Sequence, residues 1–163
     1  MRSLADTAAA APMYDMIELF YFAYRDFVGD ADRLLETFGF GRAHHRVLHF
    51  VARHPGLTIA ELLDILAITK QSLNRVLKEL VAQDFIEARA GAQDRRQRRL
   101  HVTAKGGDLA LKLACAQTRR FAAAMRALGP DAKSDAAAFL LEMIDREARE
   151  RILALIDAPE TRS

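Results

Sequence analysis

Apolar residues recur at spacings of three and four along most of this 163-residue chain, a pattern that predicts a largely helical protein. The first run predicts one long helix over residues 13–38, which Gly39 and Gly41 end. A second helix is expected over residues 42–53, because Pro55 and its neighbours stop the pattern there.

Two short helices with favourable capping residues follow. Thr58 is a good N-cap, and Glu61 three residues later completes a capping box for the first of them. Thr69 is the N-cap candidate of the second, whose apolar positions between residues 73 and 80 repeat at i, i+3, i+4 and i+7. Two capped helices joined by a tight turn predict a helix-turn-helix.

An arginine-rich hairpin is predicted next. Residues 85–89 and 100–102 are strand-like, and four arginines fill five positions, residues 95–99, between them. Arginine suits the narrow minor groove of DNA, where negative potential is concentrated. Asp94 is expected to brace the guanidinium of Arg96. The alternative is an ordinary solvated loop.

The charge of the chain is concentrated in its middle. Residues 42–101 hold 11 Lys/Arg and 6 Asp/Glu, whereas the whole chain holds 24 and 22. The rest of the chain taken together therefore holds 13 Lys/Arg and 16 Asp/Glu, a net charge of −3. This asymmetry indicates that the central module meets a polyanion while the flanks do something else.

The face of the fourth helix opposite its leucines carries only hydrogen-bond donors and no acid. Arginine reads guanine, asparagine and glutamine read adenine, and lysine holds phosphate. The alternative is a solvated amphipathic face. The predicted DNA-binding residues are Thr69, Lys70, Gln71, Ser72, Asn74, Arg75, Lys78, Asp94, Arg95, Arg96 and Arg98.

Helices are predicted on both sides of this module. Thr103 caps a long helix that ends near Leu128, and a last helix is expected over residues 134–156, with a broad apolar stripe. We therefore predict a mainly α protein with a small β-wing, in which terminal helices dimerise; a self-contained helical core is the alternative. The predicted parts are a disordered leader (1–12), an N-terminal dimerisation helix (13–41), a winged helix-turn-helix (42–103), C-terminal dimerisation helices (104–157) and a tail (158–163).

Three stretches together resemble the MarR family of bacterial winged helix-turn-helix regulators. They are Thr58-Ile-Ala-Glu-Leu-Leu, Ile68-Thr-Lys-Gln-Ser-Leu-Asn-Arg-Val-Leu, and Asp94-Arg-Arg-Gln-Arg-Arg-Leu-His-Val-Thr-Ala-Lys-Gly106. The resemblance covers roughly residues 15–155 and implies a homodimer on a pseudo-palindromic operator. It also implies that Arg96 enters the minor groove with Asp94 as its partner, and that Arg95 lies on the backbone.

Two positions depart from the family pattern. Asp84 stands where the family usually has glycine after the recognition helix, although aspartate tolerates the left-handed conformation. Asn74 replaces a common threonine or serine, which leaves the operator sequence open. The stretch Gly41-Arg-Ala-His-His-Arg-Val-Leu, with Ile68-Thr-Lys-Gln-Ser-Leu, is similar to a PetP-like branch of the family.

The resemblance implies a small aromatic or anionic effector between the dimerisation helices and the DNA-binding module. The alternative is that the same side chains serve core packing. The candidate residues are Tyr21, Tyr24, Arg25, His44, His45 and Arg46.

Other chemistry is expected to be absent. His45 and His49 have a zinc-compatible spacing but no further ligand nearby in sequence, so we predict neither metal nor cofactor. Cys115, the single cysteine, is predicted to be buried and inert, and a reducing cytoplasm fits it. No apolar run is long enough to span a membrane, and no nucleophile motif or phosphate-binding glycine loop indicates an enzyme. The rival function is a helical adaptor without DNA binding.

Overall fold

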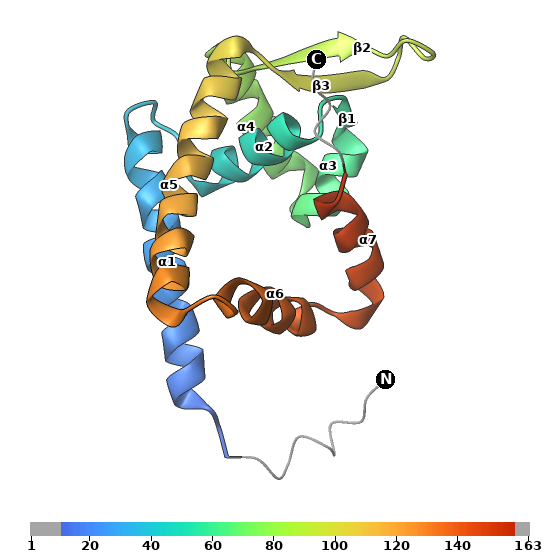
Figure 1. The fold of residues 1–163 in the computed structure, drawn as a ribbon. Helices are drawn as coiled ribbons and strands as arrows, with labels where there is room; N and C mark the ends of the chain where they lie inside the picture. The colour runs from blue at the N-terminus through green and yellow to red at the C-terminus, as the bar shows by residue number, and fades with distance from the viewer. Residues whose placement is uncertain (1–10, 159–163) are drawn as a thin grey trace.

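A computed structural model describes residues 11–158 of the chain (Figure 1). The helices are α1 (Tyr14–Glu36), α2 (Arg42–Arg53), α3 (Ile59–Leu66), α4 (Lys70–Ala82), α5 (Ala104–Leu128), α6 (Ala132–Met143) and α7 (Arg146–Ile156). The strands are β1 (Leu57–Thr58), β2 (Ile86–Ala90) and β3 (Arg98–Val102). The predicted leader and tail lie outside the described residues, except for residues 11, 12 and 158.

The predicted mainly α architecture with a small β-wing is confirmed. Figure 1 shows α5 running down from the β2–β3 hairpin at the top, first beside the compact group of α2, α3 and α4 and then beside α1. The three strands form an antiparallel sheet in the order β1-β3-β2. Strand β1, which the sequence did not indicate, is only two residues long, and its Leu57 and Thr58 pair with Leu100 and Arg99.

The core lies where α2, α3, α4 and α5 meet the sheet. The apolar face predicted for α4 is confirmed, because Leu73, Val76, Leu77 and Leu80 are all buried. Burying a leucine side chain fully stabilises a fold by about 1.5–3 kcal/mol. This shared core holds α4 in place, so that its other face is presented to the surface.

The junction between α4 and α5 is fixed by close backbone contacts. Asp84 adopts a left-handed conformation with φ +61°, as expected for a residue standing where glycine is usual. The Thr103 hydroxyl donates to the carbonyl of Asp84 at 2.6 Å, and the Lys105 ammonium donates to the carbonyl of Gln83 at 2.9 Å. The end of α4 is therefore tied to the start of the long helix α5.

The single helix predicted over residues 134–156 is wrong, because the chain breaks it into α6 and α7. Ile144 and Asp145 have extended ψ angles of 138° and 130°, which a helix cannot contain. Arg149 stabilises the break by donating to the carbonyls of Ile144 at 2.9 Å and Glu142 at 2.8 Å. Neither proline nor glycine marks this break in the sequence.

Candidate nucleic-acid interface

Helix α4 presents a polar face that begins at a well-formed N-cap. Thr69 accepts a hydrogen bond on its hydroxyl from the Ser72 amide at 3.2 Å, so the helix starts where the sequence predicted. The five long polar side chains of the predicted reading face are all exposed: Lys70, Gln71, Asn74, Arg75 and Lys78. None of them has a hydrogen bond or an ion pair with another of the described residues, so their donors are available to a ligand.

The wing is built on a tight loop between β2 and β3. The Gly91 amide donates to the Gln97 carbonyl at 2.9 Å, and the Gln97 amide donates to the Asp94 carbonyl at 3.1 Å. Asp94 also accepts a hydrogen bond from the Arg96 backbone amide at 2.9 Å. The expectation that Asp94 braces the guanidinium of Arg96 is therefore corrected: Asp94 fixes the loop backbone, and that guanidinium has no partner in the part of the chain that the structure describes.

The four arginines of the wing do not share one environment. Arg95, Arg96 and Arg98 are exposed. Arg99 is half-buried and donates to the Gly56 carbonyl at 3.0 Å, which ties the wing to the loop before α3. Local sequence patterns do not reveal this difference, because the contact joins residues 43 positions apart.

Helix α4 and the wing form one continuous surface. Asn74 and Lys78 of α4 line a groove of about 500 Å³ together with Ala88 and Arg98 of the hairpin strands. The floor of the groove is apolar and includes Leu100. The structure thus brings the two predicted DNA-binding elements together on one side of the sheet.

The histidines among the predicted effector residues are buried in α2. His44 has both ring nitrogens engaged, by the Gly41 amide at 3.1 Å and by the Glu79 carboxylate at 2.5 Å. Burial lowers the pKa of His45, and the nearby carboxylate of Asp32 opposes that effect.

The other predicted effector residues are exposed. Tyr21, Tyr24 and Arg25 lie in the first half of α1, where Arg25 pairs with Asp26 at 2.9 Å; Arg46 lies on α2. No hydrogen bond, ion pair or ring contact between described residues joins these α1 side chains to the candidate residues of α2.

Cys115 is exposed, so its predicted burial is wrong. The buried positions of α5 are Gly106, Leu109, Leu113 and Ala116, and Cys115 falls just beside that stripe. In the described part of the chain, no group of three or more His, Cys, Asp and Glu side chains is placed to hold a metal ion.

The terminal helices expose large apolar side chains. In the first half of α1, Tyr14 is 67% exposed, Ile17 60% and Phe20 50%. Helices α6 and α7 contain no buried residue, and Phe139 and Met143 are more than half exposed. Patches of this kind mark surfaces that another protein or a ligand covers. Between residues 11 and 158, no helix has the length and apolar character needed to cross a bilayer.

Comparison with known proteins gives the family. The model of the MarR family matches residues 38–97. The HTH-type transcriptional regulator PetP of Rhodobacter capsulatus is 46% identical over 142 residues, which are 87% of this chain and 86% of that protein.

Solved structures share the fold. Staphylococcus aureus MepR in its DNA-binding conformation aligns with a TM-score of 0.67 and 22% identity, covering 78% of this chain and 95% of that one. A MarR transcriptional regulator from Methanosarcina mazei Go1 aligns with a TM-score of 0.67 and 17% identity, covering 86% of this chain and 94% of that one. The resemblance read from the sequence is confirmed, and the chain belongs to the MarR family as a transcriptional regulator rather than an enzyme.

Proposed function

We propose that the chain binds double-stranded DNA sequence-specifically, with α4 in the major groove and the wing against the neighbouring minor groove. The observation that carries this proposal is the continuous surface of α4 and wing side chains that have no hydrogen-bond or ion-pair partner among residues 11–158. Unpaired guanidinium and ammonium groups contribute most to the free energy of binding to phosphates and base edges, because no contact inside the protein has to be broken first.

The roles follow from position. Arg75 and Asn74 lie in the first half of α4 and suit base edges, whereas Lys78 lies one turn later and suits phosphate. Arg96, at the loop of the wing, suits the minor groove, and Arg95 suits the backbone. The hydrogen bond from the Arg96 amide to Asp94 supports this assignment, because it limits the conformations of the loop that carries both arginines.

We propose further that the protein acts as a homodimer on a pseudo-palindromic operator. The apolar surfaces of α1, α6 and α7 support this, since a second copy would cover them. A two-fold dimer places two recognition helices on two half-sites, which provides the contact area that one module lacks.

The last part of the proposal is that a small aromatic or anionic effector weakens operator binding in the cytoplasm. Tyr21, Tyr24 and Arg25 on α1 and Arg46 on α2 support it as exposed aromatic and basic groups. Calorimetry with a panel of aromatic acids tests it: a saturable heat that accompanies weaker operator binding supports the effector, and no heat with unchanged operator affinity removes it.

The DNA-binding proposal is tested with the promoter beside the protein's own gene. Fluorescence anisotropy should give saturable binding that is at least about 10³-fold tighter than to a scrambled duplex at the same salt concentration. Light scattering should give about twice the chain mass of 18.2 kDa. A dimer that binds neither duplex at low salt would instead support the helical adaptor. A monomer that binds neither duplex would exclude both the DNA-binding regulator and the dimeric adaptor.

A further inference from the structure

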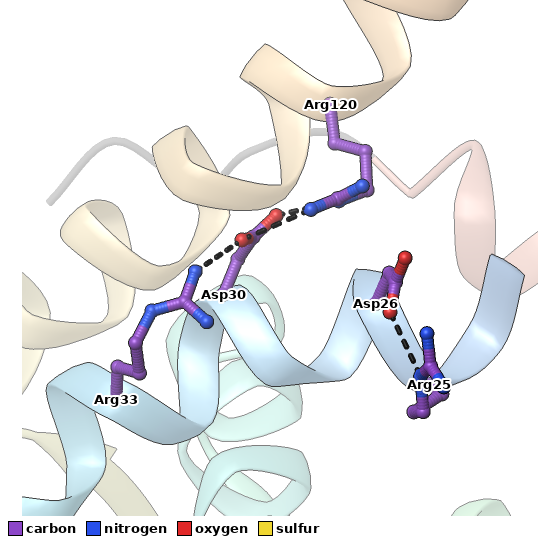
Figure 2. A network of polar contacts seen from close by, with 5 residues as sticks. All are labelled: Arg25, Asp26, Asp30, Arg33 and Arg120. Carbon is purple, nitrogen blue, oxygen red and sulfur yellow. Dashed lines mark hydrogen bonds and ion pairs between the residues drawn. The ribbon is translucent and has the colours of Figure 1, made fainter. Parts of the chain in front are cut away.

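An ion cluster joins α1 to α5 (Figure 2). The Asp30 carboxylate of α1 accepts hydrogen bonds from Arg120 of α5, at 2.6 Å from Nε and 3.2 Å from Nη2. Arg33, one turn further along α1, donates to the same carboxylate at 2.6 Å. The hydrogen bond from Arg120 is the main cause that lowers the pKa of Asp30, so the carboxyl group is ionised near neutral pH.

The cluster lines an open groove of about 680 Å³ between the two helices. Asp30, Arg33 and Leu34 form its α1 side, and Arg119 and Arg120 with three alanines form its α5 side. Arg119 has no hydrogen bond or ion pair with another described residue. The volume falls within the range of about 300–1,000 Å³ that is usual for small-molecule sites.

The charges of the groove do not balance. The lining of the groove holds three guanidinium groups and one carboxylate, and the otherwise apolar wall therefore carries an excess charge of +2. The Asp26 carboxylate also acts on Arg120, but it lies outside the lining and is paired with Arg25. Asp30 uses only some of the donors, since each guanidinium carries five N–H groups. The remaining donors of Arg33 and Arg120, with all those of Arg119, can therefore receive a second anion.

We propose that this groove binds a phosphate monoester. Such a group carries a charge of about −1.5 to −2 at pH 7 and offers three acceptor oxygens, which matches the excess charge and the forked donors. Leu34 and the alanines give the organic part of the ester an apolar surface. A monocarboxylate would leave one positive charge unbalanced, and free phosphate would leave the apolar wall exposed to water.

The binding test uses phenyl phosphate as the probe in isothermal titration calorimetry at pH 7.5 and low salt. The parent protein should give a saturable heat with one site per chain, and inorganic phosphate should bind more weakly. Arg119→Gln should weaken the binding of phenyl phosphate by about three- to tenfold, because it removes a charged donor and leaves the contacts of Asp30 in place. Asp30→Asn should strengthen it, because the internal carboxylate no longer competes for Arg33 and Arg120.

Controls separate the groove from the basic DNA-binding surface. Arg126→Gln removes the same charge from α5 outside the groove lining, and it should leave the affinity unchanged. Thermal unfolding of each variant checks that the fold is retained. Three outcomes would each overturn the proposal. They are no heat with phenyl phosphate, an equal loss of affinity in Arg119→Gln and Arg126→Gln, and inorganic phosphate that binds as tightly as the ester. Operator binding is measured separately without the probe, so the groove can fail while DNA binding stands.

Discussion

The Nε2 of His44 on α2 lies 2.5 Å from the carboxylate of Glu79 on α4, and this contact ties the recognition helix to the helix behind it. The Gly41 amide donates to Nδ1 of the same ring, so Nδ1 is the acceptor. Nε2 therefore carries the hydrogen and donates it in the hydrogen bond to the Glu79 carboxylate. Phe40 stacks on the imidazole with 4.7 Å between ring centroids. The start of α2, its histidine and the recognition helix therefore form one connected unit.

Replacing Glu79 should destabilise the protein, because the His44 ring would lose its hydrogen-bond partner. In Glu79→Ala the buried Nε2–H of His44 loses its acceptor, which should cost about 1–3 kcal/mol in the free energy of unfolding. Glu79→Gln keeps an oxygen acceptor and should lose less. Urea unfolding at pH 7.5 measures both, with Glu150→Ala, an exposed position on α7, as the control. Equal stabilities of Glu79→Ala and Glu150→Ala would contradict this role.

The stability of the protein should fall as the pH drops from about 7 to 5. Burial is the main cause that lowers the pKa of both His45 and His49 below the ordinary value of 6.5. As the pH falls, the two histidines are therefore protonated in the unfolded chain before they are protonated in the folded protein. Their contribution to the free energy of unfolding is complete above pH 6.5 and is lost as the pH falls towards their folded pKa values. Carboxylates such as Asp30, whose pKa is also lowered, act in a separate and more acidic window.

Urea titrations at pH 7.5, 6.5 and 5.5 check this window. The free energy of unfolding should decrease along the series in the parent protein. The double variant His45→Gln, His49→Gln should show a flatter dependence, whatever its stability at pH 7.5. A parent protein that is equally stable at pH 7.5 and 5.5 would exclude these histidines as the titrating groups.

Local sequence patterns predicted the elements of the module because each of their determinants lies within a few residues. Thr58 and Glu61 form the predicted capping box, with the Glu61 carboxylate accepting from the Thr58 amide at 2.8 Å. The repeat of α4 likewise specifies its buried face. The reading surface on the opposite face followed from the same periodicity.

The contacts that the sequence did not reveal depend on residues far apart in the chain. Arg99 was grouped with the other wing arginines, although it reaches back to Gly56. Asp30 and Arg120 are separated by 90 positions. The break at Asp145 interrupts an apolar stripe that has no proline or glycine, and the hydrogen bonds that stabilise the break come from Arg149.

Two adjacent glycines at the start of α5 should respond in opposite directions to the same substitution. A Cβ on Gly106 would lie 1.9 Å from the Phe85 carbonyl oxygen, whereas one on Gly107 would meet only a Val102 methyl at 3.8 Å. Gly107→Ala should stabilise the helix by about 0.5–1 kcal/mol. Gly106→Ala should destabilise the protein by about 1–3 kcal/mol or more, because backbone has to move. Thermal unfolding of both variants tests this, and a stabilised Gly106→Ala protein would contradict the close contact.

The two halves of the proposed DNA interface should fail in different ways when one arginine is removed from each. Arg96→Ala should reduce the salt slope of operator binding by about 1, because a guanidinium in the minor groove neutralises the charge of the neighbouring phosphates and releases counterions there. Arg75→Ala should cost about 1–3 kcal/mol on the parent operator and relax base preference at one position of each half-site, if it reads a guanine. Anisotropy titrations at several salt concentrations, on the operator and on single-base variants, separate the two effects. Arg126→Ala, which removes the same charge from α5, should change neither quantity, and an Arg75→Ala protein with unaltered base preference would remove Arg75 from the reading face.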